Sequence, residues 1–343
     1  LESPLVCISP DDFSSVHFVD AVEAVAVVGS DLTLISRPIE DAHQTAVIND
    51  LLQEIDGAFA DNTLKAYRSD FADFTAWCDA EGLEPWGSTA MDWAHYIGDR
   101  EPFLSAATLR RRIHSLNSLF RLANQKPHGD SPAVRLALRR MHRRKGRRQK
   151  QATPLTRSIL KALLAQCDNS LRGRRNRVLL MLGYETMRRR AELVSFRFDH
   201  LERLPGDRFA LLLPRSKTDQ LGEGSLIGLS SVLGHTLLAW HRQLGDGYIL
   251  RSLRNQKMLS TPLGAGSVSR ILKQLQREAG LSNIGELSGH SFRVGRALDL
   301  LEQGESLEKI MLRGGWQNDA SAIRYLRAWL PQASAVEDLY DSL

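Results

Sequence analysis

Two short stretches each place an arginine three residues from another ionisable side chain, and together they could hold a phosphodiester. In MRRRAEL the pair is Arg189 and Glu192, and in SGHSFR it is His290 and Arg293. Residues three apart lie on one face of a helix, so the Glu192 carboxylate can fix the Arg189 guanidinium. If the two helices met, their guanidinium groups could bind two oxygens of one phosphate and offset the extra charge of a pentacoordinate transition state.

A phosphate held in this way also needs a nucleophile and a proton donor. A tyrosine hydroxyl can attack, and a lysine or histidine can transfer the proton. Tyr325 follows Trp316 by nine residues in GGWQNDASAIRY, and Lys217 lies in PRSKT. Tyr340 is the rival nucleophile near the C-terminal end, in the amphipathic stretch AVEDLYDSL, which predicts a docking helix.

Other catalytic chemistries leave no motif in the chain. H-E-x-x-H, G-x-x-x-x-G-K-[ST] and G-x-S-x-G are all missing from the sequence. A scattered carboxylate triad for Mg²⁺ has little local signature and stays open. We predict no metal and no cofactor. The cysteines are far apart and form no C-x-x-C pair, which argues against a zinc site and fits a reducing compartment: Cys7, Cys78 and Cys167.

Charge is distributed unevenly along the chain. Residues 1–60 contain eleven acidic residues and one basic residue, Arg37, and the remainder contains 44 basic against 29 acidic residues. This pattern indicates a polyanion-binding body behind an acidic segment. An ordinary basic protein with a solvated acidic tail is the alternative. The apolar run at 25–30 is too short to span a bilayer, so we expect neither an export signal nor a membrane partner.

The hydrophobic pattern predicts the secondary structure that positions the candidate catalytic residues and the basic residues. Helical periodicity over 45–142 indicates a domain of four or five helices. Eight of the twelve residues at 139–150 are Lys or Arg, which favours a strap across a phosphate backbone over a solvated helix end. The stretch DRFALLLPRSKTDQLGEGSLIGLS predicts a β-hairpin, and helical patterns return from about residue 231 to the end.

Five motifs occur in the order and spacing of one protein family. MRRRAELVSF, the lysine in PRSKT, SGHSFRVG, GGW and the tyrosine nine residues beyond the tryptophan resemble the tyrosine recombinase (phage integrase) family. SGHSFRVGRALDLL and YETMRRRAEL are similar to Cre-type site-specific recombinases in particular. The resemblance covers about residues 55–330 and leaves the acidic start unmatched.

The resemblance implies a catalytic set and a role for each member. Tyr325 attacks the scissile phosphate, which forms a 3′-phosphotyrosine link and frees a 5′-hydroxyl. Lys217 is the general acid, His290 assists proton transfer, the two arginines stabilise charge, and Trp316 shapes the pocket. One phosphodiester replaces another, so neither ATP nor metal is needed. The full set is Arg189, Glu192, Lys217, His290, Arg293, Trp316 and Tyr325.

Three consecutive arginines leave a choice for the first catalytic position. The Arg-x-x-Glu spacing selects Arg189. On a continuous helix, Arg188 and Arg190 would project about 100° to either side of it. We expect those two to be solvated or to contact the DNA backbone.

The resemblance also implies a fold class and partners. We expect a mainly α protein, a two-domain C-shaped clamp with a helical-bundle DNA-binding domain and a mixed, mainly α catalytic domain with a small β-hairpin or sheet. The boundaries are an acidic, disordered or docking segment at 1–44, the core DNA-binding domain at 45–142, a basic linker at 143–153, and the catalytic domain with its docking helix at 154–343.

The partners would be double-stranded DNA carrying a specific recombination site and three further copies of the chain. The homo-tetramer would assemble on two duplexes by docking of the C-terminal helix. We expect it in the cytoplasm, associated with the nucleoid, and encoded by a bacterium, a phage or a plasmid. The basic residues that we expect to contact DNA are Arg110, Arg111, Arg112, Arg139, Arg140, Arg143, Arg144, Lys145, Arg147, Arg148 and Lys150. Charges on a solvated helix face are the alternative for the first three.

Three other protein classes share parts of this pattern. A type IB-like topoisomerase uses the same Arg, Lys, His and Tyr chemistry. A hairpin telomere resolvase shares the site but carries larger added domains. In a non-catalytic DNA-binding regulator, GESLEKIMLRGGWQNDASAIRYL would be only a helix-turn-helix.

Overall fold

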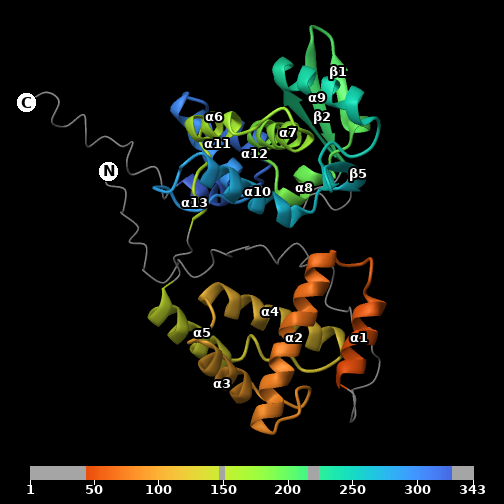
Figure 1. Cartoon of the computed structure of the whole chain (residues 1–343). Coiled ribbons are helices and arrows are strands. Elements are labelled where there is room, and N and C mark those ends of the chain that lie inside the picture. The colour runs from red at the N-terminus through yellow and green to blue at the C-terminus, as the bar shows by residue number, and fades with distance from the viewer. Residues whose placement is uncertain (1–43, 147–150, 215–223, 327–343) are drawn as a thin grey trace, which may run out of the picture. The chain divides into compact units, whose positions relative to one another are not determined.

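The computed structural model describes residues 44–146, 151–214 and 224–326. Its contacts divide the chain into two compact units, with the division between Gln149 and Lys150. Figure 1 shows both units, with the α-helices and strands β1, β2 and β5 labelled. No helix among these residues is both long enough and apolar enough to cross a membrane.

The first unit is entirely helical in its described part, as its periodicity predicts. Side-chain caps explain three of the helix starts: Thr89, Ser105 and Ser131 each accept a hydrogen bond from a main-chain N–H in the first turn. Pro132 lies in the first turn of the last helix, where its missing N–H costs nothing. The helices are α1 (Gln44–Glu54), α2 (Asp61–Glu81), α3 (Ala90–Arg100), α4 (Ala106–Leu122) and α5 (Pro132–Lys145).

An aromatic core holds these helices together. Phe74 of α2 makes edge-to-face contacts with Trp93 and Tyr96 of α3 and with Phe120 of α4. All four side chains are fully buried, and α2 packs along α4 while α3 packs along α5. The last helix continues to Lys145, so the first three residues of the expected linker at 143–153 are helical. Basic side chains in a last helical turn interact favourably with the helix dipole.

The second unit combines helices with two small antiparallel sheets. Its helices are α6 (Arg157–Ala165), α7 (Leu171–Thr186), α8 (Arg190–Ser195), the 3₁₀ turn η3 (Phe198–His200), α9 (Ser231–Leu244), α10 (Ala265–Glu278), α11 (Ser291–Glu302), α12 (Leu307–Gly314) and α13 (Asp319–Leu326). The predicted fold class, mainly α with a small sheet, is confirmed. The clamp concerns the placement of the two units and stays a prediction.

The predicted hairpin is present within a three-stranded sheet. Strands β2 (Arg208–Leu213) and β3 (Ser225–Leu229) pair antiparallel, and β1 (Leu201–Leu204) pairs with the other edge of β2. The expectation of helix throughout 231–343 is wrong at one place. Strands β4 (Arg251–Arg254) and β5 (Lys257–Pro262) form a second hairpin, because Asn255 and Gln256 both adopt positive φ in a tight turn between them.

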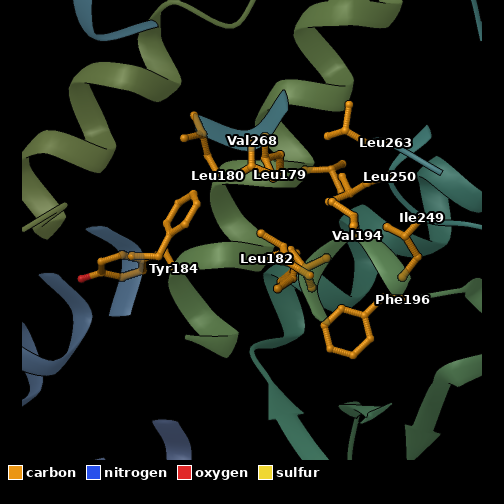
Figure 2. Packing of buried hydrophobic residues seen from close by; sticks show 14 of the residues in the cluster. Leu179, Leu180, Leu182, Tyr184, Val194, Phe196, Ile249, Leu250, Leu263 and Val268 are labelled. Carbon is orange, nitrogen blue, oxygen red and sulfur yellow. The ribbon is translucent and has the colours of Figure 1, made fainter. Parts of the chain in front are cut away.

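The core of the second unit surrounds α7. Leu179, Leu180 and Leu182 pack with residues of α8, of the 249–250 segment and of α10, as Figure 2 shows. Helix α11 approaches this core closely: a Cβ at Gly183 would lie 2.7 Å from the ring of Phe292. A separate cluster joins α11, α12 and α13 to the turn after α7, and it contains Met187, Ala297, Leu300, Ile310, Trp316, Ala322 and Leu326.

Candidate active site

The first predicted pair lies where α8 begins. Arg189 is the N-cap residue of α8, and Glu192 lies in its first turn. The Glu192 carboxylate accepts a hydrogen bond from the main-chain N–H of Arg189 at 3.0 Å and from its Nη1 at 2.9 Å. The ion pair that the spacing predicts is therefore present. The Arg189 side chain is still 26% exposed, whereas that of Glu192 is 7% exposed, so the guanidinium is held and remains accessible.

The three consecutive arginines do not share one continuous helix. Helix α7 ends at Thr186, and Met187 turns the chain with a left-handed φ of 53°. The fully buried Met187 side chain anchors this turn. Arg188 consequently points inward and is 5% exposed, so the expectation that Arg188 is solvated or contacts DNA is wrong. Arg190 is exposed.

The second predicted pair lies at the start of α11. His290 is the exposed N-cap residue, and Arg293 lies in the first turn and is 1% exposed. Arg293 Nη1 donates to the carbonyl of Met187 at 2.7 Å and to that of Gly314 at 2.9 Å. One guanidinium therefore joins the turn before Arg189 to the turn before Trp316.

Trp316 covers Arg293. The Arg293 guanidinium lies 4.5 Å from the centre of the indole ring, which is a cation–π contact. Trp316 follows Gly315, which ends α12 in a left-handed conformation, with φ 65°, that suits glycine. Trp316 is itself 7% exposed, so this stack closes the inner wall of the site.

Helix α13 brings the main chain of Tyr325 to the same cluster. Ala322 and Leu326 are buried against Met187 and Trp316. Tyr325 lies between these two anchors in the helix, while its side chain is outside the described part of the structure. The packing therefore places the helix that carries the predicted nucleophile beside the turns that carry Arg189 and Arg293.

A buried polar network fixes α11, which carries Arg293. Asp299 accepts a hydrogen bond from the Arg157 main-chain N–H at 2.8 Å and another from the Tyr184 hydroxyl. Burial, and then the hydrogen bond to Asp299, raises the pKa of Tyr184 to about 12. A Cβ at Gly295 would overlap the Leu155 carbonyl, so glycine allows α11 to approach the start of this unit.

Two further arginines hold the turns of the site: Arg188, which the sequence led us to expect at the surface, and Arg313, which no sequence pattern indicated. Arg188 Nη2 donates to the carbonyl of Arg313 at 2.5 Å, and its Nε donates to that of Thr186 at 3.0 Å. Arg313 Nε donates to the carbonyl of Glu185 at 3.1 Å. Burial lowers the pKa of Arg188, and also that of Arg313. Three arginines in a row reveal nothing of this inward role, because it depends on the turn at Met187.

The basic residues of the first unit that were predicted to contact DNA fall into two groups: those paired with a carboxylate, and those for which exposure is the main feature. Arg111 forms a bidentate ion pair with Asp70, and Arg112 pairs with Asp73. Arg144 pairs with Glu101 at 2.9 and 2.5 Å. Arg110 is half-buried on α4, and the exposed members on α5 are Arg139, Arg140, Arg143 and Lys145.

Several predicted residues lie outside the described residues. These are Lys217, Arg147, Arg148 and Lys150, together with residues 1–43 of the acidic segment predicted at 1–44 and the predicted docking helix beyond residue 326. Within the ranges that the structure does describe, no three His, Cys, Asp or Glu side chains gather as a metal site requires.

The family of the protein follows from comparison with known proteins. Residues 154–329, more than half of the chain, match the Phage integrase family. The chain therefore belongs to the phage integrase family and is a tyrosine recombinase. The matched range contains the turns at Arg189, His290, Arg293 and Trp316 that the structure brings together, and it ends shortly after Tyr325.

Two curated relatives extend the similarity over most of the chain. The Integrase/recombinase xerD homolog of Selenomonas ruminantium is 29% identical over 283 residues, covering 78% of this chain and 82% of the relative. Recombinase cre of Escherichia phage P1 is 28% identical over 296 residues, covering 79% of this chain and 85% of the relative.

Solved structures share the fold. A XerH site-specific recombinase in a post-cleavage complex with palindromic difH substrate matches with a TM-score of 0.61 at 16% identity, covering 87% of this chain and 86% of that one. A lambda integrase dimer bound to a COC′ core site gives a TM-score of 0.59 at 20% identity, covering 82% and 94%.

Proposed function

We propose that this chain cleaves and rejoins DNA strands at a specific site through a 3′-phosphotyrosine intermediate. Tyr325 is the nucleophile, and Arg189 and Arg293 bind the scissile phosphate. One observation carries the proposal: Arg293 Nη1 bridges Met187 and Gly314, so a single guanidinium links the turn that leads to Arg189 with the turn that leads to Trp316. Helix α13 packs on the same cluster.

The chemistry assigns each group a separate task. Two preorganised guanidinium groups stabilise the charge that develops on the phosphate oxygens. Glu192 holds Arg189 in position, so little reorganisation is needed as the reaction proceeds. His290 is exposed at the start of α11, where it can transfer a proton. Lys217 is the general acid in this proposal. The energy of the broken phosphodiester is retained in the phosphotyrosine, so rejoining needs no ATP or metal.

The assembly that we propose is a homo-tetramer on two DNA duplexes. Lambda integrase has been solved as a tetramer bound to a Holliday junction, and this chain shares its fold. Docking of the segment beyond residue 326 onto a neighbouring copy stays part of the proposal. The bacterial or phage source and the cytoplasmic location expected from the sequence stay predictions.

The test is covalent capture of DNA. Wild-type protein is mixed with a library of random-sequence duplexes carrying a nick, and protein–DNA adducts that resist SDS are sequenced. The expected result is one enriched sequence family with wild type and no adduct with Tyr325→Phe. Adducts that persist in Tyr325→Phe but vanish in Tyr340→Phe would move the nucleophile.

Two further outcomes separate the alternative classes. Adducts without sequence enrichment, together with relaxation of plasmids that lack any target site, would indicate a type IB-like topoisomerase. Tight DNA binding without any adduct would indicate a non-catalytic regulator and would contradict the proposal.

A further inference from the structure

Two helix C-terminal ends meet at the candidate active site. The last carbonyls of a helix have no donor within the helix and carry the negative end of its dipole. At the end of α7 these are the carbonyls of Glu185, Thr186 and Met187, and at the end of α12 they are those of Arg313 and Gly314. Two such ends repel each other unless hydrogen-bond donors lie between them.

Two buried guanidinium groups each take one carbonyl from each helix end. Arg293 bonds Met187 and Gly314, and Arg188 bonds Thr186 and Arg313. The turn after α12 also fits closely around Arg188, because a Cβ at Gly315 would lie 2.5 Å from its Nη1. Arg188 is therefore part of the joint between α7 and α12, although it is not among the residues assigned to catalysis.

Arg313 extends the same joint to the sheet. Its Nε bonds the Glu185 carbonyl at 3.1 Å and its Nη2 bonds the Gly228 carbonyl of β3 at 3.4 Å. The end of α7 is thus tied on one side to α12 and on another to the strand that follows the Lys217 segment in sequence. A substitution of Arg188 should therefore displace the end of α12 more than the end of α7.

We propose that Arg188 is a positioning residue for strand cleavage, an inference that rests on the proposed function. Arg188 holds the last turn of α12 to the last turn of α7. It thereby fixes the positions of Trp316 and of the start of α13 relative to Arg189, which directly follows Arg188 in the chain. Arg188 does not touch the phosphate. Its contribution reaches the reaction through the position of the helix that carries Tyr325.

The test compares two buried arginines of the same unit. Arg188→Met is set against Arg175→Met, because Arg175 is 6% exposed and likewise donates to a carbonyl, that of Arg251, as well as to Asn176. Single-turnover cleavage of the captured, nicked duplex is measured for each variant. DNA affinity is measured by fluorescence anisotropy with Tyr325→Phe added to each, and hydrogen exchange is followed in the peptide that contains Gly315 and Trp316.

Arg188→Met is expected to cleave about 10- to 100-fold more slowly, which is the range that a displacement of about 1 Å can cause. Its DNA affinity should stay within about threefold of wild type, because the lost interaction acts on the reacting geometry rather than on binding. The Gly315 and Trp316 amides should exchange faster. Arg188→Lys, which can still reach one carbonyl, should recover part of the rate, and Arg175→Met should keep its rate and its exchange in this peptide.

Each remaining outcome gives a clear answer. Equal losses in Arg188→Met and Arg175→Met, or an unchanged rate in Arg188→Met despite faster exchange, would overturn the positioning role while leaving the proposed function intact. If Arg188→Met does not fold, Arg188→Lys decides, since wild-type cleavage by that variant overturns the role. A wild-type protein that forms no adduct would overturn the proposed function, and this inference with it.

Discussion

In the first unit, Arg111 and Arg112 of α4 donate to the carboxylates of Asp70 and Asp73 on α2, whereas in the second unit Arg188 and Arg293 donate to main-chain carbonyls at two helix ends. Both sets bridge elements that are distant in the sequence. Their electrostatic consequences differ. A carboxylate neutralises the guanidinium that it binds, but a carbonyl dipole leaves the positive charge in place.

This difference distinguishes a structural ion-pair network from the proposed phosphate-binding site. We call the network of Arg111 and Arg112 with Asp70 and Asp73 the brace. The α2–α4 network is close to charge balance, and the side chains of Asp70 and Arg112 are 0% and 12% exposed, so it offers little to a polyanion. In the joint between α7 and α12, the carbonyls carry only the partial negative charge of two helix ends, so they offset the charge of Arg188 and Arg293 beside Arg189 only in part. The presence of buried arginines alone does not distinguish the two regions, but the partner of each guanidinium does.

The largest effect is expected when the charge of Arg293 is removed. Arg293→Met should slow strand cleavage by roughly 100- to 1000-fold, the usual cost of losing one preorganised donor to a transition state. It should also lower the free energy of unfolding by about 1–3 kcal/mol, because the Met187 and Gly314 carbonyls lose a buried donor. Single-turnover cleavage and urea unfolding measure the two effects.

Arg296→Met is the matched control for this change. Arg296 lies one turn further along the same helix and stacks on Tyr184, with 5.1 Å to the ring centre. It should lose less than about tenfold in rate, as a residue with no transition-state role does. Equal losses of cleavage rate in the two variants would mean that any positive charge on α11 has the same effect. Arg293 would then have no specific role at the phosphate.

The second prediction tests the brace. Asp70 is fully buried and accepts hydrogen bonds from Arg111 and Ser115. Asp70→Asn leaves Arg111 without its counter-charge, while Arg112 keeps its ion pair with Asp73, and should destabilise the first unit by about 2–3 kcal/mol. This is at or below the lower end for a broken buried ion pair, because Arg111 is 37% exposed. Urea unfolding followed by tryptophan fluorescence of this unit measures the change.

Asp73→Asn provides the graded control, since the Asp73 side chain is 28% exposed whereas that of Asp70 is 0% exposed. Its effect should be about 1 kcal/mol. If Asp70→Asn lowered the free energy of unfolding no more than Asp73→Asn, the buried ion pair of Asp70 would not be what stabilises this unit.

Local sequence spacing predicted the parts of this arrangement that depend on near neighbours. Glu192 reaches Arg189 because the two lie three residues apart at a helix start, and β2 pairs with β3, the next strand in the sequence. One long-range partner also left a signal. Asp70 falls between Tyr67 and Phe74 on the apolar face of α2, and a carboxylate on a buried face requires a buried cation.

The remaining features could not be predicted from spacing. The left-handed turn at Met187 is stabilised by packing against Trp316, more than one hundred residues away in the chain, and that turn is what sends Arg188 inward. The carbonyls that bind Arg188 and Arg293 exist as acceptors only because two helices end at the same place. Such contacts depend on tertiary structure rather than on residue type.

The third prediction separates surface charges from paired ones by salt dependence. Arg143 of α5 is exposed, whereas the Arg112 side chain is 12% exposed and bound to Asp73. If Arg143 contacts a phosphate, Arg143→Ala should lower the slope of log K against log salt by about 0.9 and weaken binding to all sequences alike. Arg112→Ala should leave that slope unchanged. Fluorescence anisotropy from low to moderate salt gives both slopes, and a reversed order would contradict the division.

The smallest expected effect concerns Arg144, an exposed arginine that nevertheless has a carboxylate partner. Its hydrogen bond holds the pKa of Glu101 below the ordinary value of 4.5, against the opposing effect of burial. A carboxyl group whose pKa is lower in the folded state stabilises the fold above about pH 4.5 and loses that contribution as the pH falls through the folded value.

Urea unfolding at several pH values between about 3 and 6 tests this pair. As the pH falls, the free energy of unfolding should decrease more steeply for wild type than for Glu101→Gln. Arg144→Gln should flatten the curve in the same way, because either change removes the pair. Parallel curves for all three proteins would show that Arg144 belongs with the unpaired surface charges of α5, and would move it to the group of residues that are available to DNA.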